Sequence, residues 1–100
     1  PALETETLAS VDLVFMRAPA AAVRRIGNSA FLWQAGDHSI WRLNSVGEAV
    51  WALLEIPGSA KELSAILGEV FVQVPAHKLE ADVCRVLTLM QELGFVTPSN

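Results

Sequence analysis

Apolar and polar residues change their spacing abruptly in the middle of this chain. Residues 39–43 alternate as in a strand, whereas apolar residues recur at helical spacing from Val46 to Leu54. Residues 23–26 and 30–34 have the composition of two earlier strands, separated by the turn residues Gly27, Asn28 and Ser29. A hairpin loop at residues 35–38 completes the pattern. The sequence therefore predicts three short antiparallel strands, the last of which leads directly into a helix.

The first helix is predicted to begin where the third strand ends. The side chain of Asn44 or Ser45 can accept backbone N–H groups of the first helical turn, and Glu48 stands in the capping-box position after Ser45. Pro57 and Gly58 then predict a sharp end, because proline lacks a backbone donor and glycine tolerates positive φ.

Two further helices follow in the pattern. Ser59 and Glu62 form a second capping box, and a narrow apolar stripe extends from there to Phe71. The third helix is predicted from about His77 to Leu93, with Gly94 as its C-cap. The residues expected to face the core from this helix are Leu79, Val83, Val86, Leu87, Met90 and Leu93. The predicted fold is α+β, with the order βββααα.

The residues before and after this unit have separate interpretations. Residues 11–16 are more apolar than a free tail, so they cover a sheet edge, add a strand or pack on a second subunit; a flexible arm is the alternative. We divide the chain into an N-terminal arm or extra strand at 1–18, a main folded domain at 19–96, which carries the binding site considered below, and a tail at 97–100. If residues 11–16 pair with the third strand, they cover its edge in the free protein, and a homodimer through this arm is a further hypothesis.

Composition narrows the classes of function. The 100 residues are 52% hydrophobic and 18% charged, which describes one globular domain with a single core. The net charge is −4, although residues 17–42 carry four arginines. Such a chain is a poor binder of nucleic acid, but its locally basic sheet could attract a short acidic peptide. The acidic start and the absence of a long apolar run favour a cytoplasmic protein without membrane contact.

Catalytic and cofactor chemistry has little support in the sequence. His38 and His77 are not spaced to hold a metal with each other or with an acidic pair. Cys84 lies inside an apolar helical pattern without a histidine on its face, so we expect a buried apolar residue. The glycines are scattered and form no phosphate-binding loop. We therefore predict a protein that is not an enzyme and holds no cofactor or metal.

Two alternative functions stay open at this point. Three helices beside a small sheet also describe a winged helix, whose third helix would enter DNA, but that helix is acidic on its exposed face. A small dimeric scaffold subunit is the other alternative. Leu89 and Cys84 lie off the core stripe of the third helix, so they either pack on the first helix and the sheet or form the wall of a groove.

Several segments together resemble a known family. They are residues 41–54, residues 59–63, the spacing from Leu67 to Phe71, Asp82-Val83 and residues 93–96. This ordered set is similar to the PqqD-like peptide chaperones, the precursor-peptide recognition elements of ribosomally made, modified peptides, whose type member serves pyrroloquinoline quinone synthesis. The resemblance implies a winged-helix-like domain that binds a leader peptide and presents it to a modifying enzyme, often a radical SAM protein, without doing chemistry itself.

The resemblance also implies where the peptide binds. In the family, the leader adds as a further strand to the edge of the third strand, in a groove whose other wall is the third helix. Carried onto this sequence, the site consists of Ser39, Ile40, Trp41, Arg42 and Leu43, opposite Val83, Arg85, Val86, Leu87, Leu89 and Met90. Arg42 and Arg85 are available to pair with leader carboxylates. Trp41 and Trp33 have the alternative interpretation of core residues.

Overall fold

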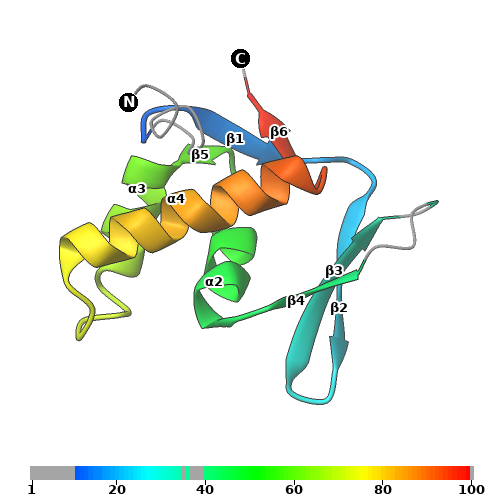
Figure 1. Cartoon of the computed structure of the whole chain (residues 1–100), viewed down its shortest axis with the longest axis horizontal. Helices are drawn as coiled ribbons and strands as arrows, with labels where there is room; N and C mark the ends of the chain where they lie inside the picture. The colour runs from blue at the N-terminus through cyan, green and yellow to red at the C-terminus, as the bar shows by residue number, and fades with distance from the viewer. Residues whose placement is uncertain (1–10, 35, 37–39, 100) are drawn as a thin grey trace.

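The computed structural model describes residues 11–34, 36 and 40–99, which form two small sheets and three helices (Figure 1). The elements in chain order are β1 (Val14–Arg17), β2 (Ala21–Ile26), β3 (Ser29–Gln34), β4 (Ile40–Leu43), α2 (Ser45–Leu53), β5 (Gly58–Ser59), α3 (Ala60–Leu67), α4 (Ala76–Glu92) and β6 (Val96–Pro98). The predicted α+β class and the succession of β2, β3, β4 and then three helices are confirmed. The strands β1, β5 and β6 add a second sheet to the predicted one.

The sheet β2-β3-β4 is antiparallel, and its register decides which side chains reach the core. Leu32 on β3 lies opposite Trp41 on β4, and Ala30 lies opposite Leu43. Ala30, Leu32 and Leu43 are buried, because this face packs against the helices, whereas the neighbouring residues of each strand point to the other face. The helices lie on one side of this sheet only (Figure 1).

The second sheet, in the order β5-β1-β6, holds the N-terminal segment. Val14 and Phe15 of β1 pair with β5, while Phe15, Met16 and Arg17 pair with β6, in both cases antiparallel. The Phe15 side chain is fully buried. This pairing contradicts the hypothesis that residues 11–16 cover the edge of the third strand, since β1 finds its partners at β5 and β6. Residues 97 and 98, assigned to a tail, are part of β6.

Helix α2 begins one residue after β4 ends. The Asn44 side chain accepts a hydrogen bond from the Gly47 N–H at 2.7 Å, so the cap is Asn44 rather than Ser45. A Cβ atom at Gly47 would lie 3.1 Å from Cδ2 of Leu43, so glycine allows this turn to approach the strand closely. The helix ends at Leu53, earlier than the Pro57-Gly58 stop predicts, and its last carbonyls are bonded within a tight turn.

The capping box of α3 is confirmed in detail. The Ser59 Oγ accepts the Glu62 N–H at 3.2 Å, and the Glu62 carboxylate accepts the Ser59 N–H at 2.9 Å. The predicted extent to Phe71 is wrong, because the helix ends at Leu67 and the next residues form a turn on the Leu67 carbonyl. Val70 is accordingly 69% exposed rather than part of the apolar stripe.

Helix α4 supplies much of the core. Leu79, Val83, Val86, Leu87 and Met90 are buried as predicted, whereas Leu93 is 40% exposed and is not a core residue. Leu93 caps the helix, and Gly94 at φ +83° turns the chain into β6, a conformation that favours glycine. The Gln34 side chain donates a hydrogen bond to the Gly94 carbonyl, which ties the end of β3 to the end of α4.

The capping box gives a test of local stability. Replacing Ser59 with alanine removes the side-chain acceptor for the Glu62 N–H, so we expect the free energy of unfolding to fall by about 1 kcal/mol. Ser45→Ala is the matched control, because Asn44 supplies the cap of α2, and it should change stability by less than about 0.5 kcal/mol. Urea unfolding of the two variants measures both values; equal losses would contradict the assignment of the caps.

Candidate functional site

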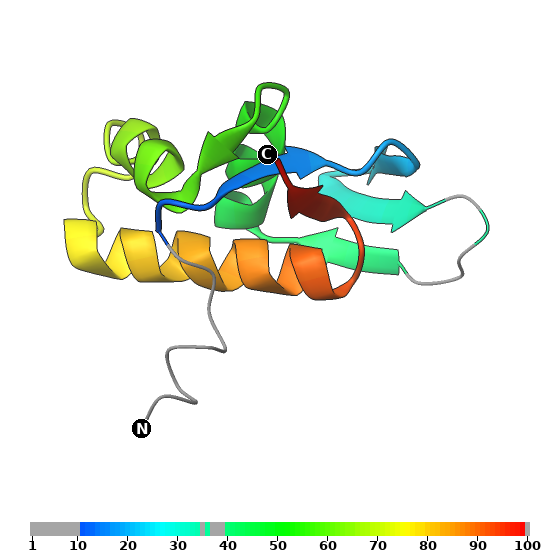
Figure 2. The ribbon, with the colours of Figure 1, turned by 90° about the horizontal axis from the view of Figure 1, so that it is seen from above.

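Strand β4 has one open edge. Within the part of the chain that the structure describes, β4 pairs with β3 alone, so its other edge presents unpaired backbone N–H and C=O groups. In Figure 1 this edge lies below the C-terminal half of α4, and in Figure 2, the view from above, the two elements lie at the same height, so neither is displaced from the other along the viewing direction of Figure 1. The open edge therefore faces the side of the molecule on which α4 runs. Ser39, the first residue of the predicted site, lies outside the described residues.

The side chains of β4 alternate between two faces. Trp41 and Leu43 share the inner face with Leu32 and Ala30; Leu43 is buried, and Trp41 is half-buried against the core. Ile40, which is 68% exposed, and Arg42 point to the opposite face. A surface hollow lined by Arg42, Leu43 and Asn44 lies at the end of the strand. The family resemblance implies one site for all these residues, and the structure places them on the two faces of the same edge strand.

The predicted residues on α4 are also divided. Val83, Leu87 and Met90 are fully buried and Val86 is 8% exposed, so they belong to the core of the free chain and offer almost no surface to a ligand. Arg85 is exposed, and Leu89 is 40% exposed. The accessible members of the predicted helix wall are therefore Arg85 and Leu89.

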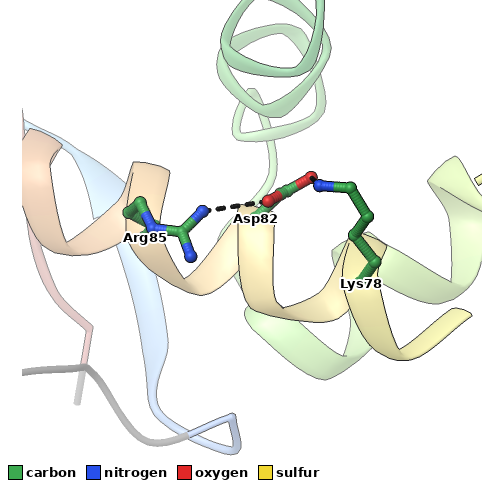
Figure 3. Close-up of polar contacts among 3 residues, drawn as sticks. All are labelled: Lys78, Asp82 and Arg85. Atoms are coloured by element: carbon green, nitrogen blue, oxygen red, sulfur yellow. Dashed lines mark hydrogen bonds and ion pairs between the residues drawn. The ribbon is translucent and has the colours of Figure 1, made fainter.

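Arg85 is engaged on its own helix. Its Nη1 lies 2.9 Å from one carboxylate oxygen of Asp82, and Lys78 Nζ lies 3.4 Å from the other, as Figure 3 shows. Such exposed pairs contribute little to stability, but they place a carboxylate between the two cations. The Asp82 carboxylate therefore balances one of the two positive charges on this flank of α4.

The four arginines of residues 17–42 differ in whether another group of the chain contacts the guanidinium. Arg17 donates to the Trp51 carbonyl and lies 4.6 Å from the Trp51 ring centroid, and Arg25 pairs with Glu48 at 2.5 Å. Arg24 stacks over Trp33 at 4.9 Å. Arg42 has no carboxylate or aromatic partner among the described residues. The sequence indicated a locally basic sheet, but it could not show which of the arginines has no partner within the folded chain.

The described residues offer little for catalysis. They contain no group of three or more histidine, cysteine, aspartate or glutamate side chains that could hold a metal ion. Cys84 is 6% exposed, and burial, together with the nearby Glu80 carboxylate, raises the pKa of its thiol. No helix of the described part is long and apolar enough to cross a membrane. His38 lies outside the described residues.

Solved structures show which class of fold this is. The chain is similar to TbiB1 in complex with the TbiA(beta) leader peptide, with 18% identity and a TM-score of 0.72, over 85% of this chain and 98% of that one. It is similar also to lasso peptide synthetase B1 complexed with the leader peptide, with 21% identity and a TM-score of 0.71, over 84% of this chain and 98% of that one. The α+β fold found here is thus the fold of those small proteins.

A family model identifies the protein family to which the chain belongs. The family described as coenzyme PQQ synthesis protein D (PqqD) matches residues 29–96, from β3 to the start of β6. The chain therefore belongs to the PqqD family, as its resemblance predicted. A search of curated proteins finds no match. The matched segment contains β4, α2 and α4, which are the elements that form and position the open edge.

The raised pKa of Cys84 gives a pH-dependent prediction. Above the usual thiol value of 9.0, the unfolded chain loses a proton that the folded chain keeps, so the contribution of this group to the free energy of unfolding falls as pH rises through that range. Cys84→Ala removes this contribution. Urea unfolding of both proteins from pH 7 to above 9.0 should show the wild-type protein losing stability faster. Parallel curves would contradict the assignment.

Proposed function

We propose that this protein binds the leader of a ribosomal precursor peptide by strand addition to β4 and presents the peptide to a modifying enzyme, such as a radical SAM protein. The observation that carries the proposal is the open β4 edge, which faces α4 in a chain of the PqqD family. The two similar solved structures are of proteins complexed with leader peptides, which supports the same role.

Strand addition would let this site bind a peptide with few polar side chains, because the backbone of β4 supplies the hydrogen bonds. The backbone groups of Ile40–Leu43 would supply hydrogen bonds that do not depend on the peptide sequence. Alternate side chains of the added strand would point inward, beside Trp41 and toward Leu89, where apolar surface is available. The buried side chains of α4 would support this wall indirectly, because their packing in the core holds the helix in place. They are Val83, Val86, Leu87 and Met90.

The charges do not favour the DNA-binding alternative. The cations of α4 are Lys78 and Arg85, and both contact Asp82. A helix that enters the major groove needs cations free to approach phosphate groups. The acidic net charge of −4 acts against the same approach.

The decisive test is an amide-resolved NMR titration of the full chain with the leader of a candidate precursor peptide. We expect shifts concentrated at residues 40–44 and 82–90, because these line the proposed strand and helix walls. Shifts confined to other residues, or no binding with several leaders and a folded sample, would contradict the proposal.

A pair of variants tests the helix wall. Leu89→Asp places a charge in the apolar part of the proposed groove, so the leader should bind about tenfold more weakly. The matched control is Ile66→Asp on α3, where the side chain is 50% exposed and lies away from β4. Isothermal titration calorimetry gives both affinities, and an equal loss in the two variants would show a general effect on the fold.

A further inference from the structure

The two faces of the β2-β3-β4 sheet offer different surroundings to any strand added at its edge. The inner face carries Trp41 and Leu43 on β4 and packs toward the helices. We call the opposite side the outer face; its described members on β2, β3 and β4 are Ala22, Arg24, Ile26, Ser29, Phe31, Trp33, Ile40 and Arg42. An added strand continues both faces, because side chains alternate and cross-strand neighbours lie on the same side.

The outer face is apolar and positively charged. Arg24, Phe31 and Arg42 form one row across the three strands, and Trp33 and Ile40 belong to the next. Arg24, Ile26, Phe31, Trp33 and Ile40 line a shallow hollow of about 280 Å³. None of the described residues of this face is acidic. The face therefore has no internal counter-charge for its arginines.

Arg42 is the cation nearest to the open edge, and its position sets it apart from the other arginines. Arg17 and Arg25 are held by the Trp51 carbonyl and by Glu48, and Arg85 is held by Asp82. Arg24 lies on the far edge strand β2, so β3 and β4 separate it from a peptide added at β4. A side chain opposite Arg42 on an added strand would be its direct cross-strand neighbour, within reach of an ion pair.

We propose that the leader segment bound at β4 carries an acidic residue opposite Arg42 and apolar residues opposite Leu43, Trp41 and Ile40. Read along β4 from Leu43 to Ile40, the recognised pattern is apolar, acidic, apolar, apolar. The inward positions meet Trp41 and Leu43, and the outward apolar position extends the surface of Ile40 and Trp33. This inference rests on the proposed function and adds the chemical class of peptide that the same site selects.

Space at the edge is consistent with this pattern. The hollow formed by Arg42, Leu43 and Asn44 lies beside the strand end, where the acidic residue and its inward neighbour would sit. The hollow of the outer face extends over β2 and β3 as far as Ile40, so an outward apolar residue beside Ile40 would extend its apolar rim. The acidic position therefore lies toward the Leu43 end of β4, and the outward apolar position lies at the Ile40 end.

The probe is a surface-displayed library of random peptides, selected on the full-length protein and on its Arg42→Glu and Arg24→Glu variants. Peptides enriched on the wild-type protein are synthesised, and NMR shifts at residues 40–43 identify those that bind at β4. We expect one acidic position flanked by apolar residues. Substituting lysine for that acidic residue should weaken binding about two- to thirtyfold, the range for replacing an attractive cross-strand charge pair with a repulsive one.

The two variants separate the role of Arg42 from the general charge of the face. Arg42→Glu should reverse the preference, so that the lysine peptide binds more tightly than the acidic one. Arg24→Glu makes the same charge change in the same cross-strand row but on the far strand, and it should keep the wild-type preference.

The outcomes distinguish this inference from the function on which it rests. Peptides that shift the β4 amides but bind equally well with glutamate or lysine, or whose preference persists in Arg42→Glu, overturn the acidic pattern and leave strand addition intact. If no enriched peptide shifts residues 40–43, strand addition itself is wrong, and the acidic pattern falls with it.

Discussion

The joint between β4 and α2 fixes the geometry on which the rest of this molecule depends. A single residue, Asn44, separates the strand from the helix, and its side chain caps the helix through the Gly47 N–H. Gly47 lies so close to Leu43 that a Cβ atom would leave only 3.1 Å to that side chain. Because α2 packs directly on α4, this joint determines how one end of the open edge lies relative to α4. At the other end of the sheet, the Gln34 side chain holds the Gly94 carbonyl just beyond α4.

The Asn44 cap and the Gln34–Gly94 hydrogen bond explain why a sheet that is buried on one face only keeps a defined position relative to the helices. Its outer face is uncovered, with Ile26 and Ile40 more than 60% exposed, so the apolar contacts that orient it come from the inner face alone. Ala30, Leu32 and Leu43 supply those contacts. The inner face therefore holds the sheet against the helices, while the open edge and the outer face stay available to another chain.

The predictability of each element follows the range of the interactions that form it. The capping box of Ser59 and Glu62 and the strand-to-helix switch at Asn44 depend on residues three positions apart or fewer, so the sequence pattern contains them. The second sheet depends on β1 meeting β5 and β6, which are very short and lie far along the chain. No local pattern identifies a two-residue strand such as Gly58–Ser59, and residues 11–16 therefore kept several interpretations.

The candidate site shows the same division. Strand alternation places Trp41 and Arg42 on opposite faces, and this much follows from the sequence. The helical stripe of α4 follows from the sequence too, since Val83, Leu87 and Met90 are buried as predicted and Leu89, just off the stripe, is 40% exposed. What the stripe does not show is that these buried residues, which the family resemblance assigns to the peptide site, offer a ligand almost no surface in the folded chain. The partners of the arginines are equally a property of the folded chain, since Arg25 meets Glu48 and Arg17 meets Trp51 only through tertiary contacts.

An open strand edge is also exposed to unwanted pairing with other copies of the protein. Proteins limit this risk with short edge strands and with charged side chains on them. β4 has four residues and carries Arg42 near its middle, and the opposite edge strand β2 carries Arg24 and Arg25. Arg24 and Arg25 lie on the far edge strand, so the charge that protects the open edge of β4 rests on Arg42. A like-charged strand is repelled there, whereas a strand with a carboxylate in register is attracted, so the same side chain can discourage aggregation and still admit an acidic peptide.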